Sequence, residues 1–244
     1  MPQGHETGIA IHVDDVHVTL GDAPPLPVLG GVDLVAPAGQ VTAIVGPSGC
    51  GKSTLLDVIA GLVAPDRGTV HLGGDGRTAL MPQRDALMPW RTLRDNVAAA
   101  AELNGVPRAD ARDMADRELL RVGLQGFGDH YPHALSGGMR QRGALARTLL
   151  SDRGAWLLDE PFGALDALTR GEMHRVLGAV RAQVNPTIVL VTHDIVEAVA
   201  LADQVLVASP RPMRITDAVD VHAMGPDAAG TQVLRALRAS GVAA

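Results

Sequence analysis

The sequence predicts an α/β fold built on a parallel sheet with helices on both faces. Short apolar stretches, such as AWLLD at 155–159 and TIVLV at 187–191, alternate with helical patterns through the second half of the chain. Strands this apolar are buried on both faces, and parallel strands need helical crossovers. A glycine-rich segment, GPSGCGKST at 46–54, joins a strand-like stretch to a helix, as expected of one unit of such a sheet.

Composition limits the class of protein. The 244 residues are 46% hydrophobic and 20% charged, which is typical of a soluble globular chain. The net charge of −6 and the absence of a basic run argue against nucleic acid as a partner. Cys50 is the single cysteine, so no disulfide framework is expected. The N-terminus has no signal-peptide pattern and no apolar run reaches the ~20 residues of a membrane span, so we expect a cytoplasmic chain.

The elements follow in order along the chain. The first 45 residues indicate strands, at IAIHV, VHVTL, VDLVA and VTAIV. A helix over STLLDVIAGL ends at Gly61, and residues 68–82 return to short strand-like pieces. Residues 92 to about 129 have helical spacing and form a helical insertion. After AWLLD come a helix over 166–183, the strand TIVLV, a helix over DIVEAVALA and the strand QVLVA; the last 28 residues predict no element.

The glycine-rich segment matches the phosphate-loop pattern G-x-x-x-x-G-K-[ST]. It consists of Gly46, four residues, Gly51, Lys52 and Ser53, and its strand-before, helix-after context is what the pattern requires. Glycines let backbone N–H groups surround phosphate oxygens at a helix N-terminus. Lys52 is the only lysine in a chain whose other basic residues are arginine. A compact ammonium reaches phosphates inside a narrow loop, whereas a planar guanidinium is too broad.

Two further motifs narrow the function. AWLLDEP ends a strand in two acids, of which Asp159 suits a Mg²⁺ shell and Glu160 suits an attacking water; the alternative is a solvated strand end. LSGGMRQR, at 135–142, begins with an N-cap serine and two glycines. Each glycine costs a helix about 1 kcal/mol relative to alanine. The motif is therefore either a plain capped helix or a backbone that must approach a phosphate closely.

With these motifs in this order, residues 9–216 resemble the ATP-binding cassette (ABC) ATPases, the nucleotide-binding subunits of ABC transporters. The resemblance implies a P-loop NTPase (RecA-like) core within a single domain, 1–244. It implies an N-terminal antiparallel β subdomain, about 9–45 with the phosphate-loop strand, and a helical subdomain, about 86–150, that carries the signature motif. It also implies a head-to-tail dimer, either a homodimer or a pair with a second ATPase subunit, that sandwiches two ATP molecules.

The resemblance also assigns residues. Gln83 resembles the Q-loop glutamine, FGALD at 162–166 the D-loop, and His193 the switch histidine that contacts the γ-phosphate. The implied cofactors are ATP and Mg²⁺. The implied catalytic residues are Glu160, His193 and Gln83, and the implied metal ligands are Ser53, Gln83 and Asp159. The implied ATP-binding residues are Gly46, Pro47, Ser48, Gly49, Cys50, Gly51, Lys52, Ser53, Thr54, Ser136, Gly137, Gly138 and Asp166.

Two positions depart from the family pattern. Leu20 stands where the family has an aromatic residue that stacks on adenine, and no aromatic residue precedes Trp90. We expect weak nucleotide binding with poor selection between bases. Met139 stands where the signature often has glutamine, although LSGGMRQR is a common form among importers. Cys50 lies near a helix N-terminus, which favours an accessible, reactive thiolate.

MPQRDALMPWRTLRDNV and DEPFGALDALTR resemble the branch that serves bacterial importers of nitrate, sulfonates, taurine and related solutes. That branch implies two permease subunits, an extracytoplasmic solute-binding protein, and a peripheral location at the cytoplasmic face of the membrane. We expect residues 84–97 to dock a permease, with Trp90 and Leu87 as apolar anchors and Arg91 or Arg94 at the rim; core burial of Trp90 is the alternative.

Other classes remain open at this stage. An ABC ATPase of a lipoprotein-release or cell-division complex shares the single cassette, but its Q-loop region should differ from RDALMPW. An ABC ATPase acting on DNA or ribosomes would need paired cassettes or long insertions in one chain, whereas these 244 residues carry one cassette and no basic patch. A P-loop kinase leaves LSGGMRQR without an explanation.

Overall fold

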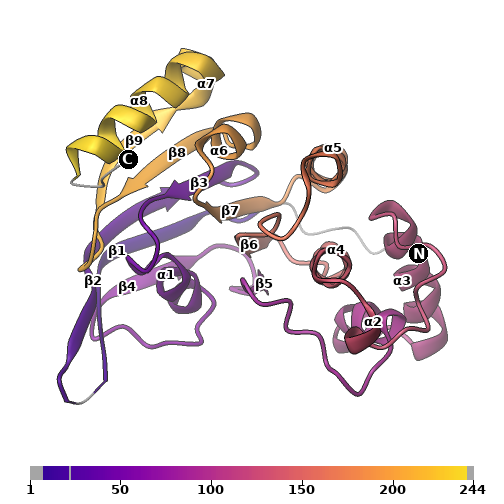
Figure 1. The fold of residues 1–244 in the computed structure, drawn as a ribbon. Helices are drawn as coiled ribbons and strands as arrows, with labels where there is room; N and C mark the ends of the chain where they lie inside the picture. The colour runs from indigo at the N-terminus through magenta and orange to yellow at the C-terminus, as the bar shows by residue number, and fades with distance from the viewer. Residues whose placement is uncertain (1–7, 22, 241–244) are drawn as a thin grey trace.

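The structure is a computed structural model that describes residues 8–21 and 23–240. Its larger sheet has six strands (Figure 1). In spatial order they are β5 (Thr78–Met81), β6 (Ala155–Asp159), β7 (Thr187–Thr192), β3 (Val41–Val45), β8 (Gln204–Ala208) and β9 (Ile215–Asp220). The first five run parallel, and β9 is antiparallel to β8. The predicted parallel sheet is confirmed.

The strand register brings the phosphate loop and the acidic pair to one edge. Val45 pairs with Thr192, and Asp159 pairs with Val191. The carboxyl ends of β3, β6 and β7 therefore meet, and the loops that follow them converge. This edge is where ligands bind in open α/β sheets.

A second, smaller sheet contains β2 (Leu26–Ala36), β1 (Ile11–Leu20) and β4 (Arg67–Leu72), all antiparallel. The two strands expected at IAIHV and VHVTL are one strand, β1, interrupted by a bulge between Val13 and Val16. At the bulge, Asp15 adopts a φ of 45° and its N–H donates to Asp33 Oδ1 at 2.8 Å. The aspartates that signal a turn in the sequence thus make a bulge, because a carboxylate from β2 satisfies the freed N–H.

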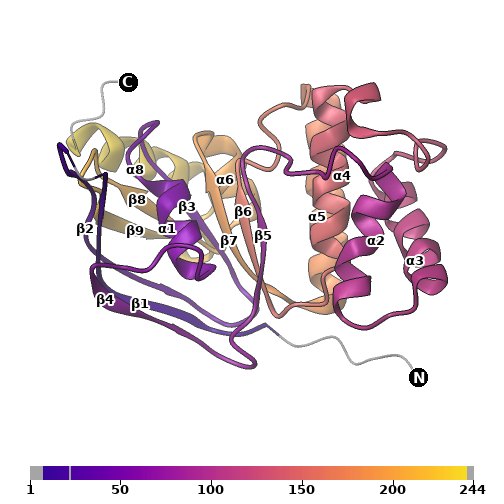
Figure 2. The ribbon, with the colours of Figure 1, turned by 90° about the horizontal axis from the view of Figure 1, so that it is seen from below.

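Helix α1 (Lys52–Ile59) fills the space between the two sheets (Figures 1 and 2). Leu55, Leu56 and Ile59 are at most 1% exposed and belong to a core shared by both sheets. Because this core fixes α1 along its length, the first turn of the helix and the loop before it are held firmly at the sheet edge.

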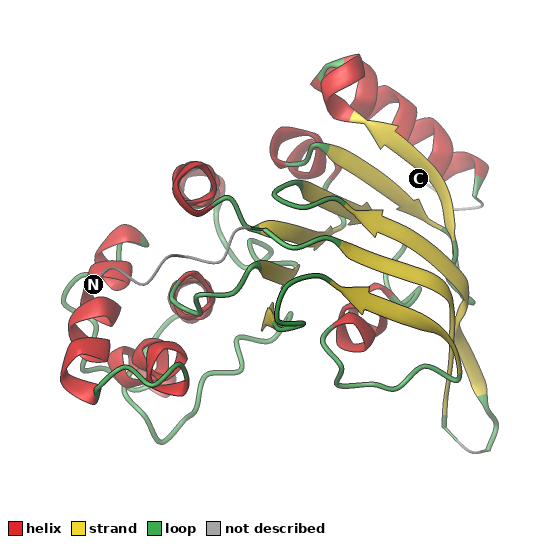
Figure 3. Ribbon diagram, turned by 180° about the vertical axis from the view of Figure 1, so that it is seen from behind, coloured by secondary structure: helices red, strands yellow, loops and turns green. Residues whose placement is uncertain are grey.

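The remaining helices cover the other face of the large sheet and extend beyond its β5 edge (Figures 1 and 3). They are α2 (Leu93–Leu103), α3 (Arg108–Arg121), α4 (Gly137–Leu149), α5 (Ala167–Val184), α6 (Ile195–Leu201), α7 (Val221–Met224) and α8 (Pro226–Ala239), with a short 3₁₀ turn at Pro132–Ala134. Within the described ranges, no helix is long and apolar enough to cross a membrane.

The C-terminal segment differs from the expectation that it holds no regular element. Strand β9 and helices α7 and α8 occupy residues 215–239. Helix α8 buries only Ala229, Val233 and Ala236, on one narrow stripe. Contact of this stripe with α6 and β8 stabilises the helix.

Candidate functional site

The lysine of the phosphate loop is enclosed by the loop itself. Lys52 is 6% exposed, and its Nζ donates to the carbonyl oxygens of Gly46 and Pro47, both at 2.9 Å. The ammonium therefore lies in the centre of the turn with its charge largely removed from water. An anion entering the loop would gain a strong interaction with this cation, because little solvent screens it.

At two glycines of the loop, neighbouring atoms of β8 and β2 leave no room for a side chain. A Cβ at Gly46 would lie 2.8 Å from Ala208 Cβ, at the end of β8. Gly51 has a φ of 128°, and a Cβ there would lie 2.9 Å from Val28 Cγ1 on β2. Any larger residue would push the loop away from the two sheets that support it, so the pattern of glycines follows from packing as well as from ligand binding.

The carboxylate at the end of β6 is buried beside the first turn of α1. Asp159 is 5% exposed. Burial raises its pKa and the charge of Glu160 raises it further, while a hydrogen bond with the Ser53 side chain acts in the opposite direction. The net pKa is above the ordinary value. A buried carboxylate beside a hydroxyl, with the pKa still raised, fits a hard divalent cation that would compensate the charge.

Glu160 is held from both sides. Gln83 Nε2 donates to its Oε2 at 3.1 Å, and His193 Nδ1 lies 3.4 Å from its Oε1. The backbone of Glu160 has a φ of 46°, and its N–H donates to Val191 O at 2.9 Å. A left-handed conformation in a non-glycine residue is uncommon and is found most often at functional sites. Two segments distant in the sequence, one with Gln83 and one with Val191 and His193, thus position this residue.

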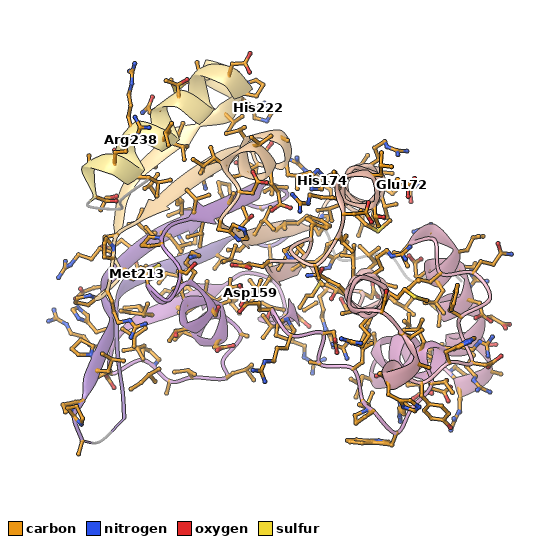
Figure 4. All side chains as sticks on the ribbon, in the orientation of Figure 1. Asp159, Glu172, His174, Met213, His222 and Arg238 are labelled. Carbon is orange, nitrogen blue, oxygen red and sulfur yellow. The ribbon has the colours of Figure 1, made fainter. Side chains whose placement is uncertain are left out.

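These groups border a cavity of about 260 Å³ at the carboxyl edge of the large sheet, where Figure 4 labels Asp159. Lys52, Ser53, Gln83, Asp159 and Glu160 line one part of it, together with Ser48, Gly49, Gly51 and Thr54. Leu20, Leu26 and Val28 line the apolar part. Leu20 therefore lies at the cavity, and none of the lining residues is aromatic. Arg211, which the sequence did not single out, lines it as well.

Not all of the candidate site residues lie at this cavity. The carbonyls of Gly46 and Pro47 hold Lys52, while Cys50 is buried at 2% exposure. The expected accessible thiol at Cys50 is therefore wrong, because the side chain packs in the core between the two sheets. His193 borders a separate hollow of about 30 Å³, which shares Glu160 with the main cavity.

The signature segment lies apart from the main cavity. Ser136 caps α4 by accepting from Met139 N–H at 3.2 Å, and Ser136 and Gly137 are exposed. Asp166 caps α5 by accepting from Leu168 N–H and Thr169 N–H. Hydrogen bonds with Thr169 lower the pKa of Asp166. These residues do not line the cavity of the same chain.

Gln141 joins the signature helix to the acidic pair, a role that its sequence position does not reveal. Its side chain is 7% exposed. Nε2 donates to the Glu160 carbonyl at 2.7 Å, and Oε1 accepts from Ala164 N–H at 2.9 Å. Because a primary amide offers both a donor and an acceptor, one side chain fixes α4 relative to the loop that follows β6.

The segment expected to dock a permease is ordered around a buried asparagine. Asn96 is 0% exposed; its Oδ1 accepts from Met88 N–H, and its Nδ2 donates to the carbonyls of Met88, Arg91 and Thr92. Trp90, inside this segment, is 74% exposed, so its predicted exposure is confirmed. Asn96 thus holds an exposed tryptophan on a rigid loop.

Leu87 is not the expected apolar anchor, and Arg91 and Arg94 form ion pairs within the chain. Leu87 is 7% exposed and belongs to the main core, so its prediction as an exposed anchor is wrong. Arg91 Nη1 lies 3.3 Å from Glu102 Oε2, and Arg94 pairs with Asp116 and Asp129. Both guanidinium groups are engaged within the helical region.

Comparison with known proteins places this site in context. Residues 29–163 match the family described as ABC transporter. The taurine import ATP-binding protein TauB of Chromobacterium violaceum is 46% identical over 78% of this chain and 75% of its own length. TauB of Roseobacter denitrificans is 40% identical over 86% and 80%. Among solved structures, a dimeric post-hydrolysis state of the ATP-binding cassette MJ0796, bound to ADP and Pi, superposes with a TM-score of 0.80 at 26% identity, over 86% of this chain and 98% of that one.

Proposed function

This chain belongs to the ABC transporter family and is an ATP-hydrolysing subunit; from that premise we propose that it drives uptake of taurine, another sulfonate, nitrate or a related small solute through partner permease subunits. The chain itself lies at the cytoplasmic face of the membrane as a peripheral subunit. An extracytoplasmic binding protein delivers the solute to the permease. The resemblance of 81–97 and 159–170 to that importer branch supports the assignment.

The single observation that carries the proposed chemistry is the position of Glu160. Its carboxylate is held by Gln83 and His193, one residue beyond the buried Asp159 and at the edge of the phosphate-loop cavity. ATP supplies the phosphoanhydride bond. Glu160 accepts the proton of the attacking water, and Gln83 and His193, one at each carboxylate oxygen, orient this group at the cavity wall.

The other groups bind and position the nucleotide. Lys52 and the N–H groups of the phosphate loop bind the β- and γ-phosphates. Ser53, Gln83 and Asp159 would hold Mg²⁺, since a hydroxyl, an amide oxygen and a carboxylate are ligands that this ion accepts. Asp159 in particular gains from a cation, because its charge is buried and its pKa is raised.

A second subunit completes the site. Ser136, Gly137 and Gly138 lie at an exposed helix N-terminus away from the cavity of their own chain. Two glycines there let a phosphate approach the backbone closely, and the helix dipole favours an anion. We therefore assign these residues, with Asp166, to the nucleotide held by the facing subunit. Closure of the dimer moves the permease that docks at Trp90.

The test is the effect of Glu160→Gln on association and hydrolysis. The amide keeps the shape of the carboxylate but cannot accept the proton, so ATP·Mg²⁺ should stay bound and hold a dimer that sedimentation velocity detects. Hydrolysis should fall at least a hundredfold, on the order expected when a general base is lost. Glu172→Gln, on α5 away from Asp159 (Figure 4), is the matched control. A monomeric Glu160→Gln variant that hydrolyses ATP at the wild-type rate would overturn the proposal.

A further inference from the structure

The nucleotide cavity has a polar and an apolar part, and none of the described residues that line the apolar part carries a ring. Lys52, Ser53 and Asp159 belong to the polar lining, and Leu20, Leu26 and Val28 form the apolar lining. Leucine and valine give a base apolar contact but no flat π surface. We expect the phosphates of a bound nucleotide to lie at the phosphate loop. The base then lies against the apolar lining. The inference below rests on the proposed function, because it needs a nucleotide in this cavity.

The loop between β8 and β9 is fixed at that apolar part. Met213 N–H donates to Val28 O at 2.8 Å, and Gly30 N–H donates to Met213 O at 2.9 Å. Met213 is fully buried, and Figure 4 places it beside β2. Since β2 carries Leu26 and Val28, the loop lies directly against the strand that forms the apolar wall. Arg211, two residues earlier, is thereby directed to the cavity, which it lines.

The guanidinium of Arg211 is oriented by the phosphate loop. Its Nε donates to Gly49 O at 3.0 Å, and Nη2 donates to the same oxygen. Gly49 has no side chain to obstruct this approach: a Cβ there would lie 3.3 Å from Arg211 Nη2. Two bonds to one acceptor fix both the position and the plane of the group. Arg211 is otherwise exposed, and it lines the cavity.

We propose that Arg211 contacts the base of the bound nucleotide and supplies the flat surface that Leu20 does not. A guanidinium is planar and delocalised, and it stacks on nucleobases as well as on aromatic side chains. The strength of stacking depends on the area of the base's π face and not on the hydrogen-bonding groups at its edge. Arg211 is thus a specificity-determining residue that favours purine over pyrimidine nucleotides and does not separate ATP from GTP.

A competing explanation is that Arg211 only braces the phosphate loop. The two explanations differ in which part of the nucleotide responds. Loss of a base contact weakens the binding of ATP but leaves the binding of inorganic tripolyphosphate unchanged, because tripolyphosphate has no base. Loss of a contact that only supports the phosphate loop weakens the binding of both ligands, because Gly49 belongs to the loop that binds the phosphates. Arg211→Lys keeps the positive charge but removes the planar guanidinium, so this variant separates stacking from electrostatic attraction.

The experiment measures dissociation constants by calorimetry for ATP, GTP, CTP and tripolyphosphate, all with Mg²⁺, on the full chain. Arg211→Ala and Arg211→Lys are compared with wild type. Arg214→Ala is the matched control, because it removes a cation from the same loop and does not line the cavity. We expect both Arg211 variants to weaken the binding of ATP and GTP about five- to a hundredfold, which corresponds to the free energy of base stacking. Tripolyphosphate should change less than about twofold, a free-energy difference well below RT ln 10.

Adding a ring should restore what the arginine supplied. Leu20→Trp in the Arg211→Ala background should recover most of the ATP affinity and leave tripolyphosphate unchanged. Equal losses for ATP and tripolyphosphate, no loss for either, or full ATP affinity in Arg211→Lys would each overturn the role of Arg211. If the wild-type chain binds tripolyphosphate and ATP with no measurable affinity, the proposed function itself fails, and the two failures are therefore distinct.

Discussion

Replacing Gln141 tests whether hydrolysis depends on a residue that touches no reacting group. Gln141→Leu keeps the approximate size of the side chain and removes both hydrogen bonds, the 2.7 Å bond to the Glu160 carbonyl and the 2.9 Å bond from Ala164 N–H. Glu160 then loses the contact that fixes its backbone to α4, although its carboxylate keeps Gln83 and His193 as neighbours.

The cost in stability should be small for a buried residue. Ala164 is exposed, so water can satisfy its freed N–H. The Glu160 carbonyl keeps a second partner, Gly163 N–H at 3.2 Å. Neither group is left fully without a hydrogen bond, and two ordinary bonds are lost at about 0.5–1.5 kcal/mol each. The apolar replacement is favourable in the core, so we expect a net loss of about 1–2 kcal/mol in the free energy of unfolding.

The cost in rate should be larger. A left-handed residue such as Glu160, with a φ of 46°, relaxes toward other conformations when a restraint is removed. A shift of about 1 Å in a reacting group lowers a rate about a hundredfold. We therefore expect kcat for ATP hydrolysis to fall about ten- to a hundredfold, with little change in ATP affinity, because the residues that line the cavity do not include Gln141.

The assay pairs steady-state hydrolysis with urea unfolding of the same samples. Gln204→Leu is the matched control, because Gln204 also makes two side-chain hydrogen bonds, to Val35 O and Thr42 Oγ1, far from Glu160. The control should lose comparable stability and keep the wild-type kcat. A Gln141→Leu variant that is folded and hydrolyses ATP normally would refute the reasoning, as would an equal loss of rate in both variants.

Two further predictions concern the segment around Trp90. Trp90→Ala should change the free energy of unfolding by less than about 0.5 kcal/mol, because the side chain is 74% exposed. Nucleotide binding should persist while permease-stimulated ATPase activity is lost; stimulation at the wild-type level would contradict a docking role. Asn96→Ala removes the buried amide that binds Met88, Arg91 and Thr92 backbone, so it should cost about 2–4 kcal/mol in urea unfolding. Although the buried Asn96 does not touch the permease, this substitution should also weaken permease stimulation of the ATPase. Unchanged stability would show that Asn96 does not order the loop.

Several features of this protein follow from the sequence alone because their causes are local. The phosphate loop needs consecutive backbone N–H groups and a lysine at a set spacing, so nine adjacent residues identify it and place it between β3 and α1. Strands β6 and β7 are apolar on both faces, and that pattern by itself predicts buried parallel strands.

The tertiary structure decided what depends on contacts between distant segments. Leu87 and Trp90 are both apolar and three residues apart, yet only packing against the helical core separates a buried side chain from an exposed one. The edge strand β9 pairs with β8, and helix α8 packs against α6 and β8, so contacts with other segments stabilise both elements.

The arrangement of the site belongs to the same category. Gln83, Glu160 and His193 follow three different strands, and parallel register at one sheet edge brings them together. Gln141 and Arg211 bind backbone atoms 19 and 162 residues away, and such bonds leave no motif in the sequence, because any backbone carbonyl can accept them. The sequence thus determined which chemistry this chain carries, while the packing of its sheets and helices decided which further side chains hold that chemistry in place.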